Sequence, residues 1–363
     1  MRRRTIIISG GGTGGHLYPA LAVGAKLKEL DPSLSLVYVG SRRSVERTIM
    51  DSRRIPFIAL PVEGLKGRGF RMLGSLALLP WAMVRSFGIL LGTRPGLVIG
   101  MGGFSSGPVV LSAALFRIPT LILEQNAAPG FTNRLLLPFV NKAVAAFPSS
   151  LSCFRGKAVV LGNPVREEFY GLRPSAGTGI FSLLIFGGSQ GSHILNEVVV
   201  GMLPLLGPDK DRLEIFHQTG SADLDRVKEG YARAAFGQAV VAPFFENMAE
   251  LFEQADLCLC RAGATTIAEL IAARKAAILV PFAKAADNHQ LCNARELERL
   301  QAAEVVTEAE LSPELLASRL RTFLDDRGKA GRLEANLEPL RTENAADNIV
   351  GLCLDMMKGG GRG

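Results

Sequence analysis

The chain alternates short apolar runs with segments of helical periodicity over most of its length. The first apolar run, residues 5–9, precedes a helical pattern at 20–30, and further runs follow at 35–39 and 55–62. Such alternation is typical of a parallel sheet whose strands are joined by crossover helices. The first half of the chain continues it at residues 97–99, 120–123, 142–145 and 158–161. A second series occupies residues 180–186, 213–217, 239–242, 257–260 and 277–280. The pattern therefore predicts an α/β protein with two doubly wound domains.

A stretch without periodicity separates the two series. Gly162-Asn163-Pro164 closes the first series, and residues 171–179 are rich in Gly, Pro and Ser. The 363 residues also exceed what one hydrophobic core usually organises. We therefore expect one domain at residues 1–165 and another at 166–343, with a final helix at 344–358 that can pack back on the first.

The charge is distributed unevenly between these halves. The whole chain carries a net charge of +7, but residues 1–165 hold 20 Lys and Arg against 6 Asp and Glu, which leaves the remainder net acidic. A basic domain suits a nucleic acid, an anionic membrane or a phosphorylated substrate. No RNA-binding or helix-turn-helix signature is recognisable, so we expect no nucleic-acid partner. The five cysteines lack CxxC spacing, which argues against a zinc site or a disulfide framework and favours free thiols in the cytoplasm.

Three glycine-rich turns follow apolar runs, at residues 10–15, 100–107 and 187–191. Glycine lets a backbone approach a phosphate closely, and the start of the next helix favours an anion. The first turn also fits GxGxxG, but Arg42-Arg43 stands where an NAD enzyme wants an acid, so an NADP-dependent oxidoreductase remains an alternative. Three such turns in two domains favour a diphosphate-bearing donor and a diphosphate-bearing acceptor facing each other across a cleft.

Several motifs carry a more specific resemblance. In chain order they are Gly11 to His16 with Pro19, Gly102-Gly103-Phe104, Glu124-Gln125-Asn126, Gly162 to Arg166, Gly187 to Gly191, and Gly263 to Glu269 followed by Asp287 to Ala294. In this order, and over nearly the whole chain, they resemble the MurG family of glycosyltransferases. Phe104 stands where a tyrosine is frequent in that family.

The resemblance implies the GT-B fold, in which two Rossmann-like domains face each other and the C-terminal one holds most of the nucleotide sugar. It also implies an inverting transferase that moves GlcNAc from UDP-GlcNAc to the C4 hydroxyl of MurNAc-pentapeptide on undecaprenyl diphosphate, lipid I becoming lipid II. Such an enzyme serves cell-wall synthesis, cell shape and division. A related transferase with a diacylglycerol or sterol acceptor, and a non-catalytic binding protein for a nucleotide sugar or an anionic lipid, remain as alternatives.

Two residues are candidates for the base that inverting transfer needs. His16 follows a phosphate-binding turn at a helix start, where its imidazole tends to be neutral. It can instead orient the loop or an acceptor phosphate. Glu124 ends a strand in a strongly basic domain, and it suits a base, an orienter of His16, or an ordering role in its own loop.

Further residues are carried over from family positions. We expect contacts to UDP-GlcNAc from Thr13, Gly14, Gly15, Asn126, Arg166, Ser189, Phe245, Ala264, Thr265, Thr266, Ile267, Ala268, Glu269 and Gln290. Among them, Glu269 is expected to accept both ribose hydroxyls and Phe245 to lie near the uracil through its backbone. The acceptor diphosphate is expected at Gly12, Gly102, Gly103 and Phe104. We expect no metal and no cofactor, because helix starts and glycine turns can neutralise a diphosphate.

Residues 72–93 are apolar enough to raise the question of a membrane span. Pro80 and Arg85 interrupt the run, and a crossover helix is required at this place between two strands. We therefore expect a peripheral protein on the cytoplasmic face of the bacterial membrane, docked on anionic lipid. The docking residues expected are Lys66, Arg68, Phe70, Arg71, Leu73, Leu76 and Trp81.

Overall fold

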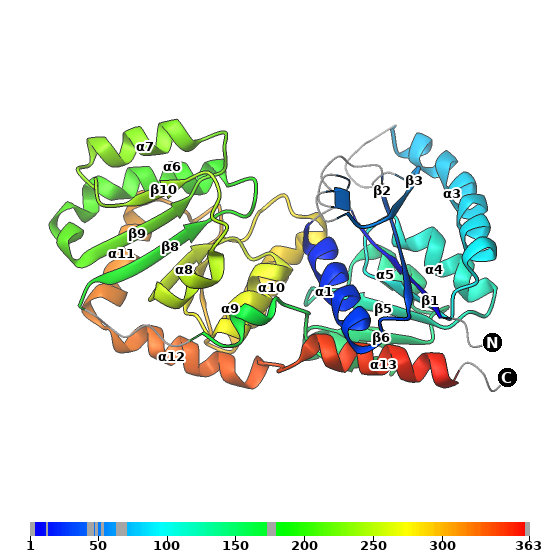
Figure 1. The fold of residues 1–363 in the computed structure, drawn as a ribbon. Helices are drawn as coiled ribbons and strands as arrows, with labels where there is room; N and C mark the ends of the chain where they lie inside the picture. Colours follow the sequence, from blue (N-terminus) through cyan, green and yellow to red (C-terminus); the bar gives the residue numbers. More distant parts are fainter. Residues whose placement is uncertain are drawn as a thin grey trace. The chain divides into compact units, whose positions relative to one another are not determined.

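The computed structural model describes residues 4–11, 14–41, 47, 50–51, 54–62, 71–172 and 179–359, without the side chains of residues 14, 71–77 and 359. The chain forms two compact units (Figure 1). The N-terminal unit comprises Met1–Val165 together with Asn344–Gly363, and the C-terminal unit comprises Arg166–Glu343.

A parallel sheet of seven strands forms the centre of the N-terminal unit, as far as the structure describes it. Its strands are β1 (Thr5–Ser9), β2 (Ser35–Ser41), β3 (Phe57–Leu60), β4 (Leu97–Gly100), β5 (Thr120–Glu124), β6 (Lys142–Ala145) and β7 (Ala158–Val160). Their order is β3-β2-β1-β4-β5-β6-β7. The chain therefore starts in the middle, winds outward to β3, and returns to the other side of β1 at β4. Ligands of such sheets bind beyond the carboxyl ends of the strands at this reversal, which here lies between β1 and β4.

Helices cover both faces of this sheet because both faces are apolar. On one face, α1 (Gly14–Leu30) packs against α13 (Ala345–Gly359), which returns from the end of the chain and is drawn in red in Figure 1. Ile6 and Ile8 point to this side, whereas Ile7 points to the other, as strand alternation requires. The second face carries α3 (Arg71–Thr93), α4 (Ser106–Leu115) and α5 (Phe131–Leu136), and the 3-10 helix η1 (Pro148–Phe154) precedes β7.

The C-terminal unit repeats this plan with a parallel sheet of six strands among its described residues. The strands are β8 (Phe181–Phe186), β9 (Leu213–Gln218), β10 (Val240–Ala242), β11 (Leu257–Cys260), β12 (Ala277–Leu279) and β13 (Glu304–Val305). Their order is β10-β9-β8-β11-β12-β13, so the reversal lies between β8 and β11. The largest core cluster of this unit packs α6, α7 and α11 onto one face of the sheet.

The helices of this unit vary from one turn to more than three. The α-helices are α6 (His193–Met202), α7 (Leu224–Arg233), α8 (Met248–Gln254), α9 (Ala264–Ala273), α10 (His289–Arg299), α11 (Pro313–Asp325) and α12 (Gly328–Leu337). Short 3-10 helices are η2 (Glu167–Phe169), η3 (Leu203–Arg212), η4 (Ala286–Asn288) and η5 (Glu338–Leu340).

The fold class expected from the apolar pattern is confirmed, since both units are doubly wound α/β structures. Most strands begin and end within one or two residues of the apolar runs. One strand has no counterpart in the pattern: β13 is only two residues long, too short to produce an alternation. The apolar segment 72–93 forms α3, and no helix in the described part of the chain has the length and apolar content that crossing a bilayer requires.

Candidate active site

At the carboxyl edge of the N-terminal sheet, two glycine-rich loops pack directly against each other. A Cβ on Gly103 would lie 2.1 Å from the carbonyl oxygen of Gly11, and one on Gly10 would lie 2.5 Å from the Cβ of Met101. The Met101 N–H also donates to the Ser9 carbonyl at 2.7 Å. Side chains at these glycines would separate the loops, so glycine here serves the close approach of two backbones at the sheet reversal.

His16 lies in the first turn of α1 and is half-buried. Its Nδ1 is 3.2 Å from Oε1 of Gln125, the residue that follows β5. The Gln125 Nε2 donates to the Met101 carbonyl at 3.0 Å, so one amide side chain connects the imidazole to the second glycine loop. The ring also lies against Gly102, where a Cβ would come within 3.0 Å of the imidazole Cε1. The structure thus brings His16, Gly102 and the 124–126 motif together.

Glu124 is buried, and four donors surround its carboxylate. Oε1 accepts from the N–H and the side-chain amide of Asn126 at 3.0 and 3.1 Å. Oε2 accepts from the Gly130 N–H and from Asn133 Nδ2, both at 2.9 Å. A carboxylate with both oxygens occupied by its own loop has little capacity to take a proton from a substrate. The geometry therefore favours the loop-ordering role over the role as base, and the side chain placed against His16 is Gln125.

The other residues expected in the N-terminal unit are placed as follows. Gly14 and Gly15 begin α1, Phe104 is half-buried in the loop before α4, and the Asn126 side chain contacts Glu124. Gly12 and Thr13 lie outside the described residues. The expectations for them therefore remain predictions.

In the C-terminal unit, the loop after β8 packs against the turn after β9. A Cβ on Gly191 would lie 1.9 Å from the Thr219 carbonyl oxygen, and one on Gly220 would lie 2.2 Å from that of Gln190. Both glycines have positive φ angles, of 73° and 76°. This arrangement repeats the glycine-to-glycine contact of the N-terminal unit, and it leaves Ser189 exposed at the tip of its loop.

The side chain of Gln218, at the end of β9, links two loops. Its Nε2 donates to the Gly188 carbonyl at 3.1 Å, and its Oε1 accepts from the Phe245 N–H at 2.9 Å. Because the Phe245 N–H already donates to Gln218, the carbonyl group is the part of this backbone that is more readily available to a nucleobase. The contact expected between Phe245 and the uracil is therefore a hydrogen bond to the Phe245 carbonyl oxygen.

Glu269 lies on α9, with a side chain that is 15% exposed. Burial raises the pKa of this carboxyl to about 7, an effect that Arg166 opposes and Glu168 reinforces. The Arg166 guanidinium lies 3.7 Å from a Glu269 oxygen and 2.7 Å from Glu168. A buried carboxylate of this kind gains most from new hydrogen-bond donors, such as the two hydroxyls of a ribose.

The first turn of α9 follows β11 at the sheet reversal, with Gly263 as its N-cap and Ala264, Thr265 and Thr266 as its first residues. The N–H groups of a first turn have no carbonyl partner within their own helix, which suits them to a diphosphate. The side chain of Ile267 is fully buried and its N–H donates to the Gly263 carbonyl at 2.9 Å, so this residue stabilises the start of the helix. The contact expected between Ile267 and UDP-GlcNAc remains a prediction.

Gln290 lies in the first turn of α10, after two consecutive residues in the left-handed region, Asp287 and Asn288. Its Oε1 accepts from the Phe282 N–H at 3.0 Å. The side-chain NH2 is therefore oriented away from that contact and can donate to the oxygen of a sugar hydroxyl.

Two residues at this edge were not singled out from the sequence, Gln218 and Arg261. Arg261 follows β11, and its guanidinium donates to Ser192 Oγ at 2.6 Å and to the Val280 carbonyl at 3.1 Å, and pairs with Glu308 at 2.6 Å. It thereby connects the loops after β8, β12 and β13. The available signal was a polar residue directly at the end of an otherwise apolar strand.

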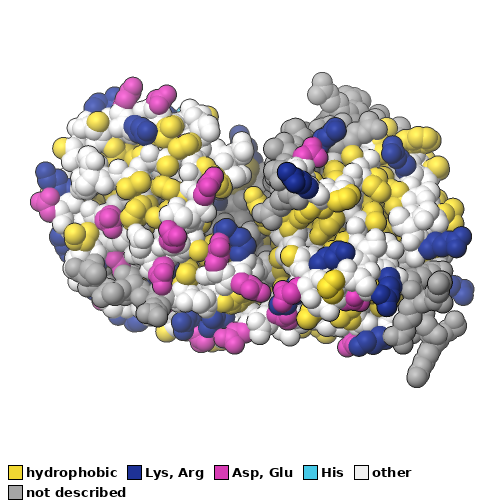
Figure 2. Space-filling view, viewed as in Figure 1, with side chains coloured by type: hydrophobic (Ala, Val, Ile, Leu, Met, Phe, Trp, Pro, Cys, Tyr) yellow, Lys and Arg dark blue, Asp and Glu magenta, His cyan; other side chains and the backbone are white. Residues whose placement is uncertain are grey.

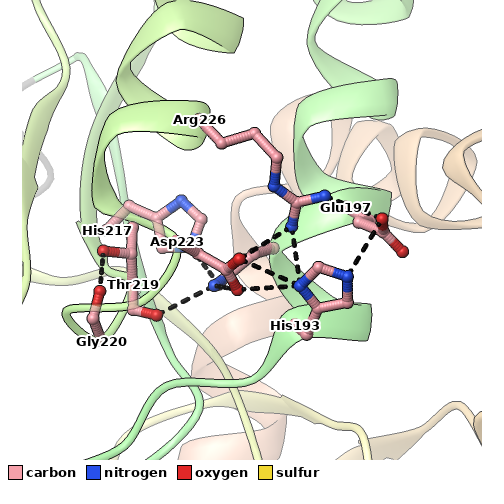
Figure 3. A network of polar contacts seen from close by, with 8 residues as sticks. His193, Glu197, His217, Thr219, Gly220, Asp223 and Arg226 are labelled. Atoms are coloured by element: carbon pink, nitrogen blue, oxygen red, sulfur yellow. Dashed lines mark hydrogen bonds and ion pairs between the residues drawn. The ribbon is translucent and has the colours of Figure 1, made fainter.

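A polar network extends behind the loop after β8 (Figure 3). Asp223 lies at its centre and accepts from His193, Asn196 and Arg226 at 2.9 to 3.1 Å. Asn196 also contacts Nε2 of His217 at 3.1 Å. Burial lowers the pKa of His217 to about 3, so this ring stays neutral at physiological pH. These contacts support a structural role for His193 and His217.

No group of three or more His, Cys, Asp or Glu side chains in the described part of the chain is arranged to hold a metal ion. The chain has Asp-x-Asp sequences at residues 209–211 and 223–225, a spacing that can hold a metal ion in other proteins. The first aspartate of each pairs with arginine: Asp209 with Arg212 and Arg321, and Asp223 with Arg226.

Comparisons with known proteins cover nearly the whole chain. The glycosyltransferase family 28 N-terminal domain matches residues 6–145, and the C-terminal domain of that family matches residues 182–349. A protein from Anaeromyxobacter sp. (strain Fw109-5) is 42% identical over 358 residues, which are 97% of this chain and 93% of the relative. One from Syntrophus aciditrophicus (strain SB) is also 42% identical, over 97% of this chain and 99% of its own length. Both are named UDP-N-acetylglucosamine–N-acetylmuramyl-(pentapeptide) pyrophosphoryl-undecaprenol N-acetylglucosamine transferase.

A solved structure shows the same relationship to MurG enzymes. The crystal structure of Acinetobacter baumannii MurG superposes with a TM-score of 0.79 at 29% identity, over 97% of this chain and 99% of that one. The chain is thus related to these enzymes over nearly its whole length. The chain belongs to the MurG family of glycosyltransferases, within glycosyltransferase family 28.

Proposed function

We propose that the protein transfers GlcNAc from UDP-GlcNAc to the C4 hydroxyl of lipid-linked MurNAc-pentapeptide, in the peptidoglycan pathway. It is a UDP-GlcNAc-dependent glycosyltransferase, as its relatives at 42% identity are named. The observation that carries the proposal is the buried Glu269 with its raised pKa, beside the first turn of α9 at the reversal of the C-terminal sheet. That pair provides a carboxylate for a ribose and N–H groups for a diphosphate.

The transfer is a single displacement with inversion at the anomeric carbon. The new bond forms between the acceptor O4 and C1 of GlcNAc, the bond from C1 to the diphosphate oxygen breaks, and the hydroxyl proton passes to a base. We assign that base to His16, because its ring is held at the reversal of the N-terminal sheet by Gln125 and Gly102. Glu124 then orders the loop from residue 124 to 130.

Charge that develops on the departing UDP needs hydrogen-bond donors at a fixed place. The loop after β8 and the first turn of α9 flank the reversal of the C-terminal sheet and can supply them. Arg261 connects the loop after β8 to the end of β12, and Gln218 connects the same loop to the segment around Phe245. Both therefore act on the donor through the loops that they hold.

The test of this function is the purified protein with labelled UDP-GlcNAc, with and without lipid I. Label should appear in lipid II, joined by a β linkage, and UDP should be released only when lipid I is present. Consumption of UDP-GlcNAc in the absence of an acceptor would contradict the proposal. A matched reaction with UDP-glucose checks that the N-acetyl sugar is required.

We further propose that the N-terminal unit docks on the anionic cytoplasmic leaflet through α3. Trp81, Val84 and Leu91 lie on one stripe of this helix and are 57%, 58% and 65% exposed, and Arg85 beside them is also exposed. Figure 2 shows apolar side chains on the N-terminal unit, with Lys, Arg, Asp and Glu among them; α3 lies at the edge of this view. Lys66, Arg68 and Phe70 lie outside the described residues, and the side chains of Arg71, Leu73 and Leu76 are not described.

Vesicle sedimentation tests this surface. Each cation near an anionic bilayer is worth about 1 kcal/mol within a Debye length of about 8 Å. Arg85→Glu should therefore weaken vesicle binding at low salt. Trp81→Ser/Val84→Ser should remove the part of the binding that persists at high salt. Leu30→Ser, at an exposed apolar residue of α1, is the matched control. Equal binding of all variants, or no preference for anionic lipid, would rule out α3 as the docking surface.

A further inference from the structure

The position of the proton on His16 can be deduced from the atoms around it. The Met101 carbonyl oxygen can only accept a hydrogen bond, so the end of the Gln125 amide that faces it, at 3.0 Å, must be the NH2 group. The amide oxygen of Gln125 consequently faces the imidazole, where it lies 3.2 Å from His16 Nδ1. An amide oxygen also only accepts, so the hydrogen bond requires a proton on Nδ1.

We propose that Gln125 is a positioning residue that holds His16 as the Nδ1–H tautomer. The lone pair of the neutral ring is then on Nε2, and the proton that the ring gains and loses in catalysis is the one on Nε2. This consequence rests on the proposed role of His16 as base, whereas the tautomer itself follows from the contacts alone. Glu124, the neighbour of Gln125, does not supply this function because its carboxylate accepts three bonds from its own loop and a fourth from Asn133 in α5.

The surroundings restrict the imidazole and the amide to this arrangement. Gln125 is only 2% exposed, and the Met101 residue to which it donates is itself held by the bond from its N–H to the Ser9 carbonyl. The imidazole lies against Gly102, whose φ of 89° and lack of a side chain let the ring approach the backbone. A rotation of the Gln125 amide would place two oxygens against each other at Met101 and an NH2 against the ring.

The same reasoning assigns the opposite tautomer to His217 in the C-terminal unit. Asn196 Nδ2 donates to the Thr219 carbonyl and to Asp223, both at 2.9 Å, so its Oδ1 must be the atom that faces His217. That oxygen lies 3.1 Å from His217 Nε2, which therefore carries the proton, and Nδ1 accepts from the Tyr231 hydroxyl at 3.1 Å. One protein thus contains both tautomers, each set by a buried amide (Figure 3 shows His217, Thr219 and Asp223 of the second site).

Nitrogen NMR of the full-length protein labelled with ¹⁵N-histidine tests the inference. Protonated and unprotonated ring nitrogens resonate in separate ranges, and at about pH 8 histidines of ordinary pKa are neutral. A His16→Asn sample identifies the His16 signals, and a His217→Asn sample those of His217. We expect a protonated Nδ1 for His16 and a protonated Nε2 for His217. A protonated Nε2 on neutral His16 would overturn the proposal, and this measurement needs no variant of Gln125.

Gln125→Leu tests the cause. Removing the amide should shift the His16 signals to a mixture of tautomers and lower kcat about 10- to 100-fold, with the KM for UDP-GlcNAc little changed. Gln218→Leu is the matched control, because it removes the corresponding buried amide of the other unit. It should raise the donor KM and leave the His16 signals in place. Unchanged His16 signals in Gln125→Leu would refute the role of Gln125.

The two proposals can fail separately. If His16→Ala keeps a normal kcat, His16 is not the base, but the spectrum still decides whether Gln125 sets its tautomer. Thermal unfolding of Gln125→Leu shows whether a loss of kcat reflects loss of folded protein.

Discussion

The two sheets end in similar amide contacts that serve different purposes. Gln125 and Gln218 both lie at the end of a strand, both are 2% exposed, and both donate to a carbonyl of a glycine-rich loop. The other end of Gln125 meets His16, a half-buried side chain, whereas the other end of Gln218 meets a backbone N–H. In the proposed mechanism the first contact therefore prepares the base, whereas the second fixes the shape of two loops.

Glu124 of the N-terminal unit and Glu269 of the C-terminal unit also differ in how far their own surroundings satisfy them. Glu124 has both oxygens occupied by donors of its own loop, whereas Glu269 has a guanidinium at 3.7 Å and a pKa raised to about 7 by burial. A carboxylate that is already satisfied stabilises the fold, and one that is buried and poorly satisfied is stabilised by a ligand that brings donors. Burial and partners, more than residue type, thus separate structural groups from functional ones.

The largest effect is expected from His16→Ala. Loss of the base should lower kcat by about 10² to 10⁴ while binding of UDP-GlcNAc survives. Steady-state kinetics with saturating lipid I measures this. A normal kcat would mean that the contacts of Gln125 with His16 and Met101 do not prepare a base. The proposed difference in purpose between Gln125 and Gln218 would then be wrong.

A smaller effect, on a different constant, is expected from Glu269→Ala. Loss of a charged contact to the ribose is worth about 1.5 to 3 kcal/mol, which corresponds to an increase of about 10- to 150-fold in the KM for UDP-GlcNAc. The KM for lipid I should not follow. Glu168→Gln, which changes the other, more exposed carboxylate near Arg166, is the matched control. A similar increase in both variants would mean that the charge of the cluster matters and not the ribose contact.

His217→Phe should affect stability and not chemistry. The substitution leaves Asn196 Oδ1 and the buried Tyr231 hydroxyl without their partner, at a cost of about 1 to 3 kcal/mol for each unsatisfied group. Urea unfolding should show this loss, and kcat per folded molecule should stay within about threefold of wild type, well under the factor of ten that 1.4 kcal/mol represents. A kcat loss as large as that of His16→Ala would show that His217 is not a purely structural histidine, contrary to the proposal.

The last prediction concerns pH. The donor is expected to bind the ionised form of Glu269, whose pKa in the free protein is raised to about 7, so protons compete with the donor below that pH. The KM for UDP-GlcNAc should rise as the pH falls below about 7, by at most about tenfold per unit, and stay flat above it. Glu269→Gln should lose this dependence. A donor KM that is independent of pH between 5 and 8 in the wild type would exclude an ionised Glu269 as the ribose contact.

The pattern of apolar residues was sufficient for the two parallel sheets, because buried parallel strands are continuous apolar runs. It also located the glycine turns at the strand ends and placed His16, Glu124 and Glu269 near them. It missed β13, because two residues are too few to produce an apolar pattern. Family resemblance supplied most of the remaining contacts.

The sequence could not choose between His16 and Glu124 as base, for a physical reason. The donors that satisfy Glu124 come from Asn126, Gly130 and Asn133, and their convergence depends on the path of one loop in three dimensions. For the same reason Gln125 was named only as part of the motif at residues 124–126, without a role of its own, and Gln218 was not named at all. A polar residue at the end of a strand is only a weak indication of a functional role as long as the carbonyl group to which it donates is unknown.

Calorimetric titration of the wild type, His16→Ala and Glu269→Ala with UDP-GlcNAc tests the division of roles most directly, because it separates binding of the donor from chemistry. We predict that His16→Ala binds UDP-GlcNAc as the wild type does and that Glu269→Ala binds it about 10- to 150-fold more weakly. The opposite pattern, with donor binding lost in His16→Ala and retained in Glu269→Ala, would contradict it.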